Sequence, residues 1–258
     1  MNPSHTPMNQ NHSPQDIVVG LDIGTTKIAC IVGQRNAHGK LEVIGYGRSE
    51  SIGVTRGVVA NIEHTVQSIR TAVEAAEKSA NVRIEVVNVG IAGQHIKSLQ
   101  HRGQLIRTET EEEINRSDVQ QLIDDMKKLK VLPGEEILHV LPQEFTVDGE
   151  TGIKEPVGHT GVRLEANFHI ITGQTSAAKN IYRCIKRAGL QVDQLILEPI
   201  ASSSAVLSEE EKEAGVALVD IGGGTTDIAI FQEGIIRHTA VIPFGGNAIT
   251  DDIKQGCG

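Results

Sequence analysis

The feature that most constrains this chain's fold is a phrase that occurs twice. Residues 22–29 read Asp-Ile-Gly-Thr-Thr-Lys-Ile-Ala, and residues 220–229 read Asp-Ile-Gly-Gly-Gly-Thr-Thr-Asp-Ile-Ala. When the two additional glycines are removed, seven of the eight aligned positions are identical. Each copy lies between two apolar runs, so each is predicted to form the turn of a β-hairpin. The repeat predicts two related halves whose turns face each other across a cleft.

The residue types in this phrase suit the binding of a nucleoside triphosphate. Glycine lets the backbone approach a phosphate and direct its N–H groups toward it. Threonine hydroxyls add uncharged donors, and an aspartate at a strand end suits Mg²⁺, which prefers carboxylates and keeps several waters. One copy alone could be an ordinary glycine-rich turn. Two facing copies predict that phosphates bind between them.

Composition excludes several other classes of function. The net charge is −9 and aromatic residues make up 2% of the chain, so a nucleic acid is not expected as a partner. No apolar run reaches the length of about 18 residues that a membrane span needs. The three cysteines are far apart in the sequence, which fits a reducing cytosol and argues against disulfides or structural zinc. Residues 1–15 are polar and are predicted to be a disordered tail.

The two ends of the chain show an alternating α/β pattern. Asn61 is predicted to cap the N-terminus of a helix over 62–80, and Gly189 is predicted to end a helix over 175–188. A third helix is expected from Pro199 to about Leu207, whereas Glu209–Glu213 is interpreted as a solvated loop. The predicted strands are 17–21, 27–32, 41–46, 84–91, 192–197 and 216–219, with a hairpin over 228–231 and 235–242.

Residues 94–174 differ in texture and are predicted to be an inserted α+β module. An acidic stretch, Glu109–Glu113, is interpreted as a solvated lead-in to a helix. That helix is predicted to begin with a capping box formed by Ser117 and Gln120. Short strands are expected at 137–141, 145–147 and 166–172. The histidines His139, His169 and His238 are assigned core or surface roles, because no second metal ligand lies at a regular spacing.

The two phrases resemble the phosphate 1 and phosphate 2 loops of the actin, heat-shock chaperone and sugar kinase superfamily. Residues 191–207, which include Leu197-Glu198-Pro199, resemble the superfamily's first connecting segment. Three further stretches are similar to the FtsA family of bacterial cell-division proteins. They are 138–144 (Leu-His-Val-Leu-Pro-Gln-Glu), 152–158 (Gly-Ile-Lys-Glu-Pro-Val-Gly) and 241–247 (Val-Ile-Pro-Phe-Gly-Gly-Asn).

The resemblance implies an actin-like, ribonuclease H-like duplicated α/β fold, of which the chain holds the N-terminal part. Subdomain 1A would comprise 16–93 and 175–207, the inserted subdomain 1C would comprise 94–174, and 208–258 would begin an incomplete subdomain 2A. The insert would replace subdomain 1B of actin and lie elsewhere on the body. The adenine-binding motif, the partner-binding subdomain and the membrane helix would lie beyond Gly258.

The resemblance also assigns candidate site residues and the cofactors ATP and Mg²⁺. Asp22 and Asp220 would hold Mg²⁺ through water, with Asp227 nearby. Glu198 would orient the attacking water; the alternative is that it is only a favourable charge at the N-terminus of a helix. Lys27 would reach a phosphate or remain a solvated strand residue. The nucleotide-binding set is Asp22, Gly24, Thr25, Thr26, Lys27, Asp220, Gly222, Gly223, Gly224, Thr225, Thr226, Gly245 and Gly246.

The function implied by the resemblance is that of an ATP-binding protein with at most slow ATPase activity. It would assemble into filaments, bind FtsZ and other division proteins, and attach to the cytoplasmic side of the inner membrane through a C-terminal helix absent from this chain. Two alternatives stay open. One is a phosphotransferase of the sugar kinase class, for which no substrate-binding aspartate motif is found. The other is a pilus-assembly relative that shares the insert.

Overall fold

The computed structural model describes residues 17–108 and 112–257. Its largest unit is a five-stranded sheet in the order β11-β6-β1-β2-β3. Strands β1, β2 and β3 are antiparallel neighbours, while β6 runs parallel to both β1 and β11. The bounds are β1 Ile17–Ile23, β2 Lys27–Arg35, β3 Leu41–Glu50, β6 Val86–Ile91 and β11 Gln191–Leu197. A two-stranded hairpin, β4 Val54–Thr55 and β5 Val58–Val59, follows β3.

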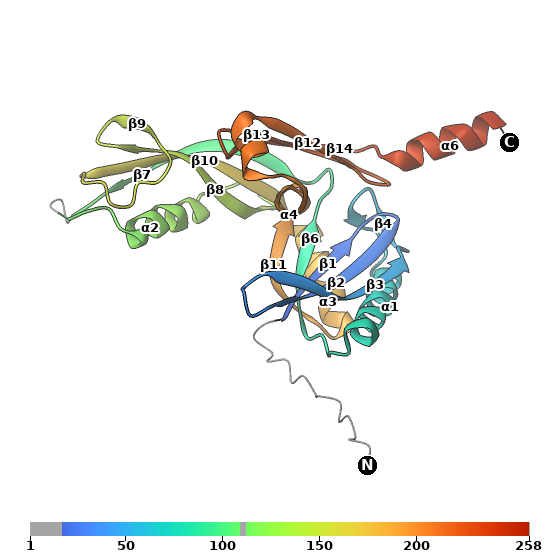
Figure 1. Ribbon diagram of the computed structural model, residues 1–258. Helices are drawn as coiled ribbons and strands as arrows, with labels where there is room; N and C mark the ends of the chain where they lie inside the picture. The colour runs from blue at the N-terminus through green and yellow to red at the C-terminus, as the bar shows by residue number, and fades with distance from the viewer. Residues whose placement is uncertain (1–16, 109–111, 258) are drawn as a thin grey trace, which may run out of the picture.

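Two amphipathic helices cover one face of this sheet (Figure 1). Helix α1 (Ile62–Ala80) begins at Asn61, whose side chain accepts a hydrogen bond from the His64 N–H, as predicted. Helix α3 (Thr175–Ala188) ends at Gly189, which adopts the left-handed conformation expected of a C-terminal glycine. Aliphatic side chains from both helices and from the strands between them form the main core, in which Ile28, Ile69 and Ile185 are fully buried.

The second sheet belongs to the segment that the sequence marks as an insert. Its strand order is β7-β10-β8-β9, and all neighbours are antiparallel. Helix α2 packs against it around Leu122 and Met126, which gives this unit a core of its own with Phe168 at its centre. The bounds are β7 Lys97–Ile106, α2 Arg116–Lys127, β8 Glu135–Val147, β9 Glu150–Ile153 and β10 Arg163–Gln174. The predicted boundaries at 94 and 174 stay a prediction.

A third sheet, in the order β12-β13-β14, lies beside the insert, and helix α6 projects away from it (Figure 1). Helix α4 links the five-stranded sheet to this third sheet through the short helix α5. The Gln143 side chain on β8 and the His169 side chain on β10 bond to Ile236 O and Thr239 Oγ1 of β14. The bounds are α4 Glu198–Val206, α5 Glu209–Ala214, β12 Val216–Ile221, β13 Thr226–Gln232, β14 Ile235–Ile242 and α6 Gly246–Cys257.

Two predictions about helix starts were wrong. The capping box of α2 is formed by Asn115 and Asp118, not by Ser117 and Gln120. The Glu209–Glu213 stretch is helix α5 rather than a loop, because Ser208 and Glu211 form a capping box that satisfies its first N–H groups. The predicted disordered tail, 1–15, and residues 109–111 of the acidic stretch lie outside the described residues.

Candidate functional site

The two repeated phrases form turns with the same backbone geometry. In the first turn, the Gly24 N–H donates to Lys27 O at 3.1 Å, and in the second the Gly222 N–H donates to Thr225 O at 2.9 Å. The strand pairs that flank the turns carry the same register: Asp22 lies opposite Ala29, and Asp220 lies opposite Asp227. Both turns therefore have equal length, and the structure has no two-residue insertion in the second one.

Equal length overturns the gapped alignment of the two phrases. Without the gap, Gly223 and Gly224 occupy the places of Thr25 and Thr26, and Thr225 occupies the place of Lys27. The ladder position of Ala29 is taken by Asp227. The phrases therefore match in backbone and in the run Asp-Ile-Gly, whereas their remaining side chains differ in charge and size.

The tips of the two turns touch each other. A Cβ atom on Gly223 would overlap the methyl group of Thr26, and one on Gly224 would lie 2.8 Å from the Thr25 hydroxyl oxygen. The Thr25 hydroxyl also accepts a hydrogen bond from the Gly57 N–H in the β4–β5 turn, at 3.2 Å. Glycines at the second tip are thus explained by the close approach of the first turn.

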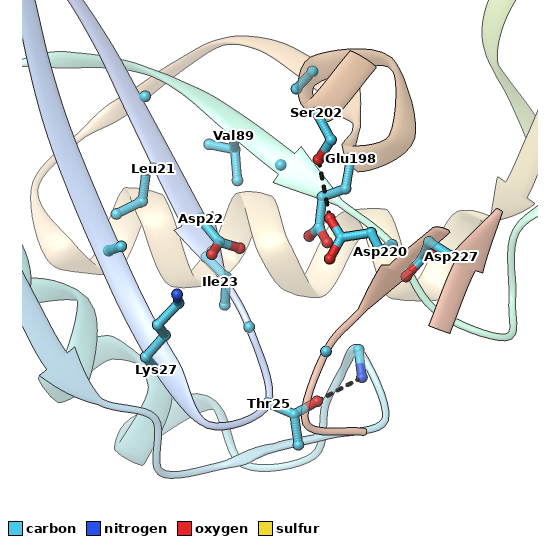
Figure 2. A pocket seen from close by; sticks show the side chains of 18 of the residues that line it. Leu21, Asp22, Ile23, Thr25, Lys27, Val89, Glu198, Ser202, Asp220 and Asp227 are labelled. Carbon is cyan, nitrogen blue, oxygen red and sulfur yellow. Dashed lines mark hydrogen bonds between the residues drawn. The ribbon is translucent and has the colours of Figure 1, made fainter. Parts of the chain in front are cut away.

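Behind this contact lies a cavity of about 740 Å³ between the five-stranded sheet, helix α4 and the third sheet. Figure 2 shows the side chains of Asp22, Glu198 and Asp220, which come from three different elements, directed into the same space. Eleven of the predicted site residues line the cavity: Asp22, Gly24, Thr25, Thr26, Lys27, Glu198, Asp220, Gly222, Gly223, Thr225 and Asp227.

Four carboxyl groups line the cavity, and their negative charges repel one another. Burial, followed by the charges of Asp22, Asp227 and Asp220, raises the pKa of Glu198 well above its ordinary value. Burial also raises the pKa of Asp22, which Lys27 opposes and Asp220 reinforces. The pKa of Asp227 is raised to about 6, mainly by burial. Such a cluster favours a cation, which would relieve the repulsion.

Two residues outside the predicted set shape this cluster. The Ser202 hydroxyl on α4 donates a hydrogen bond to Asp220 Oδ2 at 3.0 Å, which orients that carboxylate (Figure 2). Gly90 on β6 leaves room for Glu198, because a Cβ atom there would lie 3.2 Å from Glu198 Cγ. Ser202 lies in the connecting segment that the sequence singled out, four residues after Glu198 and so on the same helix face. No sequence signal marked Gly90.

The other four predicted residues do not line the cavity but support the second turn. The Gly246 N–H donates to Gly222 O at 2.9 Å, and Gly245 packs against the backbone of Gly222 and Gly223. The Thr226 hydroxyl donates to Phe244 O at 2.8 Å. Gly224 lies at the tip that contacts Thr25. The role of all these residues toward a nucleotide stays a prediction.

The donor set decides which kind of metal the cavity fits. Within residues 17–108 and 112–257, no group of three or more His, Cys, Asp or Glu side chains is placed to hold a metal ion directly. Asp227 is 4% exposed, and its Oδ1 atom has no hydrogen-bond partner within the described part of the chain. Carboxylates that converge without forming a cage fit Mg²⁺ that keeps its own waters.

Two related turns, one from the five-stranded sheet and one from the third sheet, together with a connecting helix that carries a carboxylate, define an actin-like protein. Solved structures support this fold. The chain superimposes on a chain of the "PilM-PilN type IV pilus biogenesis complex" with a TM-score of 0.66, 15% identity and coverage of 93% of this chain and 65% of the other. For the ethanolamine utilization protein EutJ of Carboxydothermus hydrogenoformans, the TM-score is 0.52 at 17% identity, with 95% of this chain and 58% of that one covered.

Sequence comparisons identify the family among the actin-like proteins. The chain belongs to the FtsA family of cell division proteins. The family model "SHS2 domain inserted in FTSA" matches residues 93–172, and "Cell division protein FtsA" matches 217–258. The chain is 49% identical to the cell division protein FtsA of Pseudomonas aeruginosa over 239 residues, which cover 93% of this chain and 57% of that protein. Identity to the FtsA of Escherichia coli (strain K12) is 43%, with 94% of this chain and 57% of that protein covered.

The chain thus spans a little more than half the length of the curated relatives that it matches. In the described residues, no helix combines the length and hydropathy that crossing a bilayer requires.

Proposed function

We propose that the cavity between the two turns binds Mg-ATP. The observation that carries this proposal is the pair of turns with the same backbone geometry, one from the five-stranded sheet and one from the third sheet. The cavity between them is lined by four carboxyl groups and one lysine. Glycine lets the backbone of each turn approach phosphate oxygens closely, and the carboxyl groups suit the metal that accompanies them. Neither feature alone would select a metal-bound triphosphate.

Each side chain then has a definite task. Asp22 and Asp220 hold the hydrated Mg²⁺, with Ser202 keeping Asp220 in place. Lys27, on the opposite strand of the first hairpin, reaches the phosphates. A Mg²⁺ ion held by these carboxylates would supply positive charge to the cavity. Glu198 would then lose its proton more easily and would orient the attacking water. Hydrolysis is expected to be slow at most.

We further propose that the protein from which this chain derives links the FtsZ ring to the cytoplasmic membrane at the division site. The identities of 49% and 43% to FtsA proteins support this role. In this proposal it binds ATP, assembles into filaments through its actin-like body, and contacts FtsZ and other division proteins. Membrane attachment uses a C-terminal helix outside the present 258 residues.

The test of nucleotide binding is a calorimetric titration of Mg-ATP into the full-length protein and two isosteric variants, Asp22→Asn and Asp220→Asn. Each variant is expected to bind Mg-ATP at least about tenfold more weakly, because a carboxylate contact to a metal complex is lost. The difference should shrink when EDTA replaces Mg²⁺. The matched control is Asp193→Asn, which removes an exposed carboxylate on β11. Unchanged affinity in both cavity variants, with circular dichroism showing intact folds, would refute the site.

A further inference from the structure

A histidine of the insert contacts the backbone next to Glu198. His139 lies on β8, opposite Ile171 of β10, and its Nε2 atom accepts a hydrogen bond from the Leu197 N–H at 3.0 Å. An imidazole nitrogen can accept only when it carries no proton, so the ring must be neutral with its proton on Nδ1. Burial lowers the pKa of His139, which keeps the ring in this form at neutral pH.

The position of this hydrogen bond is significant because Leu197 is the N-cap residue of α4. Its own side chain makes no capping hydrogen bond, so the start of the helix lacks the usual local anchor. The residue that follows, Glu198, directs its side chain into the cavity (Figure 2), and Pro199 restricts the backbone of Glu198. The hydrogen bond to His139 therefore fixes the backbone at Leu197, one residue before Glu198.

The same strand, β8, also contacts the third sheet. Gln143 on β8 donates a buried hydrogen bond to Ile236 O at 2.6 Å, and Glu144 forms an ion pair with Arg237 at 2.6 Å. Leu141, between these contacts and His139, packs against both the core of the five-stranded sheet and that of the third sheet. One continuous strand thus touches the start of α4 and the hairpin that carries Asp227.

We propose that His139 is a positioning residue for Glu198, through which strand β8 of the insert sets the direction of this carboxyl group in the cavity. The proposal rests on the proposed function only for its effect on hydrolysis. Its structural part concerns the protein without nucleotide. A partner that binds the insert and displaces β8 would, by the same contact, change the placement of Glu198.

The decisive experiment uses the full-length protein without nucleotide. His139→Leu removes the acceptor, whereas His139→Gln places an amide oxygen near the position of Nε2. In His139→Leu, the Leu197 amide is expected to exchange with solvent about tenfold faster, as the loss of one hydrogen bond predicts. The pKa of Glu198, followed by carboxyl ¹³C NMR, should fall toward its ordinary value as the side chain leaves the cluster. His139→Gln should restore both readouts.

A second arm measures hydrolysis as a double-mutant cycle with Glu198→Gln. His139→Leu should lower kcat about tenfold and leave the Kd of Mg-ATP within about twofold, and it should have no further effect in the Glu198→Gln background. If His139→Leu does not fold, His139→Asn serves instead, because its shorter side chain keeps the amide but cannot reach Leu197.

The outcomes separate the two proposals. An unchanged Leu197 exchange rate and an unchanged Glu198 pKa in the acceptor-less variant would overturn the role of His139, whatever the nucleotide result. Absence of Mg-ATP binding by the unaltered protein would overturn the proposed function, and the nucleotide-free NMR result would still decide the role of His139. Additive effects in the cycle would also contradict the proposal.

Discussion

The two turns share a backbone but not a chemistry. The first turn supplies two threonine hydroxyls and the Lys27 ammonium group, and Ala29 pairs with its aspartate, Asp22. The second supplies two glycines at its tip, and its aspartate, Asp220, pairs with the buried Asp227. Backbone hydrogen bonds at 3.1 and 2.9 Å hold the two in the same shape.

This difference shows how a duplicated hairpin can divide one task between its copies. The first turn carries the groups that suit an anion, and the second carries the additional group that suits a cation. The bare tip of the second turn fits against the side chains of the first, so the side chains missing from one copy make room for those of the other.

The largest expected effect concerns Asp227, whose place in the first hairpin is taken by Ala29. An ordinary aspartate titrates near 3.8, and Asp227 in the folded protein titrates at about 6. Between these values the folded state binds more protons than the unfolded chain, so this group lowers stability as pH rises from about 4 to about 6. Asp227→Asn should therefore stabilise the protein without nucleotide at pH 8 by about 2 to 3 kcal/mol.

Urea unfolding at two pH values checks this prediction. The gain in the free energy of unfolding should be present at pH 8 and disappear at about pH 3, where the aspartate is largely protonated in both states. Asp193→Asn should show no such gain. A gain that does not depend on pH would mean that the effect comes from packing and not from charge.

The second prediction breaks the contact between the tips. Gly223→Ala adds a methyl group that overlaps Thr26, so we expect a loss of about 2 kcal/mol in stability, typical of overpacking. Thr26→Ser removes the methyl group that causes the overlap and should restore most of the loss in the double variant. Thermal or urea unfolding of the four proteins measures this coupling. Equal losses with and without Thr26→Ser would show that the tips do not touch.

The smallest predicted effect belongs to Lys27, which is exposed at the edge of the cavity. Lys27→Met should weaken Mg-ATP binding about tenfold, since one charged contact to phosphate is lost in a solvated setting. Lys40→Met, in the turn between β2 and β3, is the control of the same chemistry away from the cavity. Equal affinities of the two variants, measured by calorimetry, would assign Lys27 to the solvated face.

Elements with strong local signals were predictable from the sequence. Helix α1 carries a side-chain cap at Asn61 and a regular apolar stripe, and α3 ends at a glycine, so both were confirmed. Strand β7 was missed because its residues are mostly polar and exposed, and its pairing with the apolar β10 creates it. The predicted strands 137–141 and 145–147 are one strand, β8, which continues through Pro142 with a register shift in its pairing to β10.

Much of the candidate site could be anticipated because its residues sit in the repeated phrase. The correspondence within the phrase could not, since identical letters favoured a gap that the strand register does not contain. Ser202, Gly90 and His139 act through contacts between segments far apart in the sequence, such as the 58 residues that separate His139 from Leu197. Only the folded chain brings these pairs together.

The most direct test of the account is a crystal structure of the full-length protein with Mg²⁺ and a non-hydrolysable ATP analogue. We expect the phosphates to lie between Gly24 and Gly222, with the metal on the side of Asp22 and Asp220 and with Glu198 facing the terminal phosphate. A nucleotide bound elsewhere, or one held by the first turn alone while the second faces solvent, would contradict it.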